Sequence, residues 1–139
     1  MSYGSYARAQ QVTLNASPEQ TEIHALSAGA KRLADAQANG STAAILEAVR
    51  WNWKVWTLFQ VALIDPANPA PWEIRENLLS LAKFIDKQTI EILASPQAEK
   101  LGALININRQ IAAGLSEGHQ KAQTAASPSP ANNPTSTRT

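Results

Sequence analysis

The stretch that decides the fold is AAILEAVRWNWKVWTLFQVALI, which spans residues 43–64. When its residues are projected at a helical period of 3.6, the polar side chains fall within a wedge of about 80°. Almost every other direction around the helix axis is apolar, so we expect a helix that its neighbours cover on several sides. The wedge consists of Glu47, Arg50, Lys54 and Thr57.

This helix carries two apolar stripes on different faces. Aromatic residues at helical spacing usually pack in a core, so both stripes can belong to one central core helix. Alternatively, the second stripe is surplus to the bundle and forms one wall of a groove for the amphipathic helix of a partner. The first stripe contains Leu46, Val49, Trp53, Trp56 and Leu63, and the second contains Trp51, Val55, Leu58 and Ala62.

Capping residues predict where the helices on the N-terminal side begin and end. Ser17 can cap a helix whose first turn holds Pro18, and Gly40 supplies a left-handed stop. Ser41 then caps the apolar helix described above. The sequence therefore predicts one helix over residues 18–39 and a second that begins directly after it.

Prolines divide the C-terminal half in the same way. The connector over residues 65–71 holds three prolines, each of which removes a backbone donor and restricts the residue before it. We expect a helix over residues 72–94 and a last helix that Ser95-Pro96 opens and that frays near Gly118.

The predicted fold class is all-α, a compact bundle of four main helices. A chain of 139 residues has the usual size of a single domain, and no segment shows the period-2 alternation of strands. We assign residues 1–118 to one helical-bundle domain, with a short amphipathic helix near its N-terminus. Residues 119–139 are rich in Ala, Ser, Pro and Thr and are expected to form a disordered tail.

Composition excludes several classes of protein. The chain has no cysteine, so a disulfide-stapled secreted scaffold and a thiolate metal site are both ruled out. The first residues lack the apolar core of a secretory signal, and the longest apolar run, Val55 to Ile64, is too short to cross a bilayer. A net charge of +1 argues against direct capture of nucleic acid or an anionic membrane. We expect a cytoplasmic protein.

No catalytic, metal or cofactor motif stands out in the sequence. His24 and His119 lie far apart, and neither has a carboxylate at the spacing of metal ligands. We therefore predict no enzymatic activity, no metal site and no cofactor.

Two polar features leave alternatives open. Asn108 follows the apolar stripe of the last helix, where it either fixes the helix register through hydrogen bonds or, together with Arg109, contacts a ligand. Arg50 and Lys54 stand one turn apart beside tryptophans, a mixture that single-stranded RNA-binding surfaces also use. Because Glu47 adjoins them, an ordinary solvated face is the simpler interpretation.

The order of these features resembles the FlaF family of flagellar biosynthesis regulators. The resemblance covers about residues 3–118 and contains no catalytic motif. The stretches that carry it are AKRLADA at residues 30–36, WNWKVWTLFQVALID at residues 51–65, PWEIRENLLSLAKFIDKQTIEIL at residues 71–93 and LININRQIAAGL at residues 104–115.

The resemblance implies a cytoplasmic, non-enzymatic factor that promotes flagellin synthesis and export. Proteins of this family are associated with flagellin as a chaperone or adaptor, and they act alongside the opposing regulator FlbT. The alternative is a post-transcriptional regulator that acts on the flagellin transcript, or on a partner regulator, without binding flagellin.

From the stripe and the resemblance together, we predict that a terminal amphipathic segment of flagellin binds beside the second apolar stripe. Trp51, Val55 and Leu58 would be the apolar anchors of this site. Arg50, Lys54 and Arg109 would set the orientation of the partner at the rim.

Overall fold

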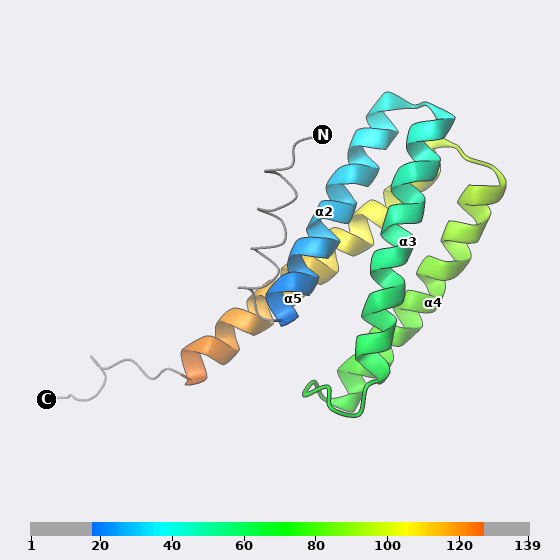
Figure 1. The fold of residues 1–139 in the computed structure, drawn as a ribbon. Coiled ribbons are helices and arrows are strands. Elements are labelled where there is room, and N and C mark those ends of the chain that lie inside the picture. Colours follow the sequence, from blue (N-terminus) through cyan, green and yellow to red (C-terminus); the bar gives the residue numbers. More distant parts are fainter. Residues whose placement is uncertain (1–17, 127–139) are drawn as a thin grey trace, which may run out of the picture.

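A computed structural model describes residues 18–126, which form an antiparallel bundle of long helices (Figure 1). The described residues contain helices and no strand, so the predicted all-α class is confirmed. The short N-terminal helix and the part of the tail after residue 126 lie outside the described residues. The elements are α2 (Pro18–Asn39), α3 (Thr42–Ile64), α4 (Trp72–Ala94), the 3₁₀-helix η1 (Ala98–Leu101) and α5 (Gly102–Ala126).

The predicted breaks around α3 are confirmed. Gly40 has a φ of 78°, in the left-handed region that glycine adopts without strain. The hydroxyl oxygen of Ser41 accepts a hydrogen bond from the backbone N–H of Ala44 over 3.1 Å, as expected of an N-cap. Because one residue ends α2 and the next begins α3, the two helices form a tight antiparallel hairpin.

The last helix differs from the prediction at its start. Ser95-Pro96 does not open α5; the backbone remains non-helical there, turns through η1, and α5 begins only at Gly102. The amide of Gln37, on α2, donates to the carbonyl oxygen of Ala98 over 3.1 Å. This bond holds the turn against the end of α2, so a tertiary contact outweighs the local helix-start signal.

The end of α5 also differs from the prediction. The helix passes Gly114 and Gly118 and continues to Ala126, so residues 119–126 are helical although we expected them to be disordered. A glycine inside a helix costs only about 1 kcal/mol. α5 packs along α2, and near its end Nδ1 of His119 lies 3.5 Å from a carboxylate oxygen of Glu19. Packing against α2 therefore offsets the cost of the two glycines, and α5 stays helical beyond both of them.

The core is apolar and centred on α3. Trp56 is fully buried and meets Phe59 in an edge-to-face contact with ring centroids 5.4 Å apart. Of the first apolar stripe of α3, Val49, Trp56 and Leu63 are buried, whereas Leu46 and Trp53 are half-buried. On the α4 side, Nε1 of Trp53 donates to the carboxylate of Asp86 over 2.8 Å. Other helices contribute further buried residues, among them Leu26, Leu33, Ile85, Ile92, Leu101 and Leu104.

One polar side chain, Asn108, joins three helices inside this core. Its Oδ1 accepts a hydrogen bond from Nε1 of Trp56 over 2.9 Å. Its Nδ2 donates to the carbonyl oxygen of Leu26 over 3.0 Å and to Oδ1 of Asn52 over 2.7 Å. These bonds tie α5 to α2 and α3, which supports the interpretation of Asn108 as a residue that fixes the helix register.

The network needs a glycine opposite it on α2. A Cβ atom at Gly29 would lie 2.6 Å from Oδ1 of Asn52 and 2.8 Å from Nδ2 of Asn108. Both atoms are buried and bonded to each other, so neither can move away without breaking the network. Gly29 therefore sets how closely α2 approaches α3 and α5.

The connector between α3 and α4 is held by side chains that cap the end of α3. Arg75 donates from Nε to the carbonyl oxygen of Leu63 over 2.8 Å and from Nη2 to that of Asp65 over 3.0 Å. Nδ2 of Asn68 donates to the carbonyl oxygen of Ala62 over 2.8 Å. These bonds satisfy carbonyl groups that the helix end leaves free.

No helix of the described residues is long and apolar enough to cross a membrane.

We expect the substitution Gly29→Ala to destabilise the fold by about 1–3 kcal/mol, because the added methyl group overpacks the buried amide pair. Gly114→Ala is the matched control, since a Cβ at Gly114 meets nothing within 4 Å. It should instead stabilise α5 by about 0.5–1 kcal/mol. Urea unfolding of the two variants and the parent chain measures both effects. Equal effects of the two substitutions would contradict the role given to Gly29.

Candidate partner-binding site

The outward face of α3 presents most of the residues that the sequence predicts for the site. Arg50 and Lys54 are exposed, and neither makes an ion pair within residues 18–126. Leu58 is 70% exposed, which is unusual for a leucine, and Val61 on the next turn is 59% exposed. Val55 is half-buried beside them. The C-terminal half of α3 therefore shows an apolar strip to solvent.

Trp51 packs against α2. Less of its side chain is therefore accessible to a partner than we expected for a residue that lines a binding groove. The guanidinium carbon of Arg32 lies 4.3 Å from the centroid of the Trp51 ring, in a cation–π contact. A Cβ at Gly29 would lie 3.6 Å from the same ring. Trp51 is half-buried, so it packs α2 onto α3 and offers only part of its surface to a partner.

A small apolar hollow of about 140 Å³ lies beside the strip, between α2 and α3, and is called the flank hollow below. Val55 and Leu58 form its α3 side, so the structure brings these two predicted residues together at one concave surface. Its lining residues are Thr21, Glu22, Ala25, Leu26, Val55, Leu58 and Phe59.

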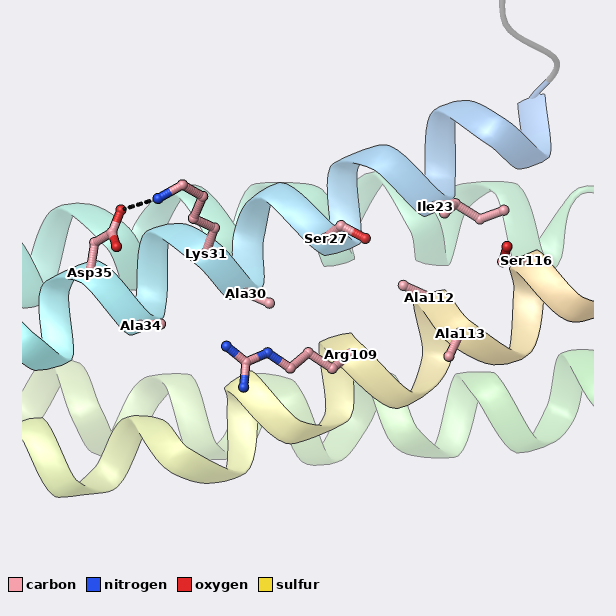
Figure 2. A pocket seen from close by; sticks show the side chains of 10 residues that line it. All are labelled: Ile23, Ser27, Ala30, Lys31, Ala34, Asp35, Arg109, Ala112, Ala113 and Ser116. Atoms are coloured by element: carbon pink, nitrogen blue, oxygen red, sulfur yellow. Dashed lines mark hydrogen bonds and ion pairs between the residues drawn. The ribbon is translucent and has the colours of Figure 1, made fainter.

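Arg109 lies apart from the other predicted site residues. It lines an open groove of about 580 Å³ between α2 and α5, and its side chain extends into this groove from α5 (Figure 2). Alanines of both helices also line the groove. The ion pair of Lys31 with Asp35, at 3.0 Å, lies on the rim of this groove. The α2 residues of this groove and those of the flank hollow point about 170° apart around the helix axis. The two surfaces are thus on opposite sides of α2.

A larger hollow of about 450 Å³, called the end hollow below, lies where α2 begins and α3 ends. At this end of the bundle α5 and α4 separate (Figure 1). The hollow is mainly apolar because five apolar side chains of three helices line it, two of them buried, two half-buried and one, Ile74, 50% exposed. They are Phe59 and Leu63 of α3, Ile74 and Leu78 of α4 and Leu115 of α5, and the rim holds Glu19, Glu22, Asn68, Pro69 and Ala70.

Glu22 lines both hollows and is the residue that sequence analysis missed. Burial raises the pKa of its carboxyl above the ordinary value of 4.5, and the neighbouring carboxylate of Glu19 raises it further. Within the described residues Glu22 has no Lys or Arg partner, whereas Glu19 has His119. The sequence signal that could have identified Glu22 was its position three residues after Glu19, at the start of an amphipathic helix.

These surfaces can bind an amphipathic segment through apolar contact and charged rims. Among residues 18–126, no cluster of three or more His, Cys, Asp or Glu side chains is arranged to hold a metal ion. The flank hollow and the end hollow adjoin each other, because both are lined by Glu22 and Phe59.

Comparison with protein families shows a match over most of the chain. The family model described as "Flagellar protein FlaF" matches residues 2–115, which include both hollows. A search of curated proteins and a search of solved structures gave no match.

We expect Glu22→Gln to stabilise the fold at neutral pH and to have little effect in acid. A carboxyl whose folded-state pKa is raised binds protons more readily in the folded than in the unfolded state, so its contribution to stability falls as the pH rises from about 4.5. Urea unfolding from pH 4 to pH 8 measures the difference. Glu91→Gln, at an exposed position on α4, removes the same charge as a control. A Glu22→Gln effect that does not grow with pH would contradict this expectation.

Proposed function

We propose a function from one premise: the chain belongs to the FlaF family of flagellar proteins, and its role is in flagellar biosynthesis. On that premise, the protein binds flagellin as a chaperone or adaptor and promotes flagellin synthesis and export. The bound element is an amphipathic terminal segment of flagellin, held in the cytoplasm before assembly.

The observation that carries this proposal is the apolar strip on α3 beside the flank hollow. Leu58 and Val61 stand about one turn apart and are mostly exposed, although leucine and valine are among the residues most often buried. Covering apolar surface stabilises a complex by roughly 25 cal/mol for each Å² removed from water. A bundle whose central helix keeps such a strip uncovered is suited to a helical partner.

Each predicted residue has a part in this arrangement. Leu58 and Val55 are the anchors, and Trp51 supports them from its position against α2. Arg50 and Lys54 flank the strip toward the start of α3 and orient the partner through charge. Arg109 contacts the partner only if the bound segment also reaches the groove between α2 and α5.

Experiment can distinguish flagellin from two other targets, the regulator FlbT and the flagellin transcript. The regulator FlbT is the further protein partner that the family resemblance implies, and the α3 strip could receive its helices in place of flagellin. Direct action on the flagellin transcript would depend on Arg50 and Lys54 and would weaken steeply as salt is added, because cations that neutralise phosphates release counterions.

We expect Leu58→Ser to weaken the binding of monomeric flagellin about tenfold or more, because it removes an apolar anchor. Leu58 is exposed, so the fold should be unaffected, whereas Trp51→Ala would also loosen the packing of α2 on α3. Ile90→Ser is the matched control, since Ile90 is 56% exposed on α4. It should bind flagellin like the parent chain.

Titration calorimetry at low and moderate salt measures these affinities. Apolar helix-in-groove binding should show a negative heat-capacity change and little dependence on salt. If the parent chain releases no heat with flagellin and forms no complex, the chaperone proposal is wrong and FlbT or the transcript becomes the target to test. If Ile90→Ser and Leu58→Ser weaken binding equally, the α3 strip is not the docking surface.

A further inference from the structure

Glu22 sits at the junction of the two hollows, in the middle of the apolar surface. It lines the flank hollow together with Val55 and Leu58, and it lines the end hollow together with Ile74 and Leu78, which are exposed and half-buried. Its carboxylate therefore lies between two groups of apolar anchors, and a helix that spans both groups must pass over it.

This position is unfavourable unless a partner supplies a positive charge. Glu22 is already half-buried, and within the described residues it has no Lys or Arg partner. A purely apolar helix would cover the carboxylate further and remove water that now solvates it, which is costly for an unpaired charge. Nδ1 of His119 lies 3.5 Å from a carboxylate oxygen of Glu19, whereas no basic side chain of the described residues pairs with Glu22.

We propose that the segment that docks on this surface carries a lysine or arginine between its apolar anchors, and that Glu22 selects this basic residue. The inference rests on the proposed function, since it describes the chemistry of the segment that the α3 strip receives. The stem of the basic residue packs on Leu58, which lines the flank hollow together with Glu22 and is mostly exposed, while its charged head reaches the carboxylate.

The charges along the surface also fix the direction of the bound helix. Arg50 and Lys54 lie toward the start of α3, whereas Glu22 lines both hollows nearer the end of α3 and Glu19 lines the end hollow. A bound helix with an acidic residue near one end and a basic residue near the other matches this pattern in one orientation only. The reversed orientation places like charges together, which suppresses it.

Two synthetic amphipathic peptides of 18 residues test the inference without flagellin. They share one apolar face and differ at a single central position beside it, which is Lys in one peptide and Gln in the other. Fluorescence anisotropy gives the affinity of each peptide for the full chain and for its Glu22→Gln and Glu91→Gln variants. Glu91 is an exposed carboxylate near the opposite end of the bundle and controls for net charge.

We expect the Lys peptide to bind the parent chain and the Glu91→Gln variant about tenfold more tightly than the Gln peptide. Glu22→Gln should abolish this preference. Equal binding of the two peptides to the parent chain, a preference that survives Glu22→Gln, or no binding of either peptide would each overturn the inference. Because Glu22→Gln is expected to be at least as stable as the parent chain near neutral pH, unfolding would not mimic the expected loss.

Titration of monomeric flagellin separates this inference from the proposed function. If flagellin binds and Glu22→Gln weakens that binding about tenfold while Glu91→Gln does not, both are supported. If flagellin binds, Leu58→Ser weakens it and Glu22→Gln has no effect, the proposed function stands and selection by Glu22 is wrong. If the peptides show the Lys preference but flagellin does not bind, the surface is as inferred and its partner is another protein.

Discussion

The architecture depends on the burial of one amide, that of Asn108. A side-chain amide without partners inside a core costs about 1–3 kcal/mol, so the arrangement in which every part of it is bonded is strongly preferred over a shifted one. Three separate groups satisfy it: the Trp56 indole, the Asn52 amide and the Leu26 carbonyl. A slide of α5 by one residue would break all three bonds.

This constraint also explains which surfaces stay open. The network draws α5 and α3 onto α2, while α4 is attached to α3 through Asp86, which binds both Trp53 and Gln60. Nothing comparable links α4 to α5 within the described residues, and the two helices separate at one end (Figure 1). There Ile74 stays exposed and Leu78 and Leu115 stay half-buried, and all three line the end hollow. The open surface is therefore found where hydrogen bonds tie α5 and α3 to α2, and α4 to α3, but none joins α4 to α5 within the described residues.

The sequence predicts the helices well and the site only in part. Prolines, Gly40 and Ser41 act through local backbone geometry, so they mark the limits of α3 and the start of α4 reliably. Ser95-Pro96 misled because a tertiary bond to Gln37 controls that turn, and no local pattern contains it. The division of the predicted site, with Arg109 across α2 from Leu58, depends on how three helices pack around one another. Glu22 matters because two hollows meet there, which only the packed structure shows.

The connector of residues 66–71 has a consequence for binding. Its prolines restrict the backbone of the unfolded chain. In the folded protein the backbone N–H groups of Ala67 and Ala70 donate hydrogen bonds to the side-chain oxygens of Asp65 and Asn68, which hold the turns of the connector. Pro69 and Ala70 form the rim of the end hollow, so that rim is already in place when a ligand arrives. For a segment that docks there as proposed, association would need no loop closure on the side of the bundle, so less conformational entropy would be lost on binding.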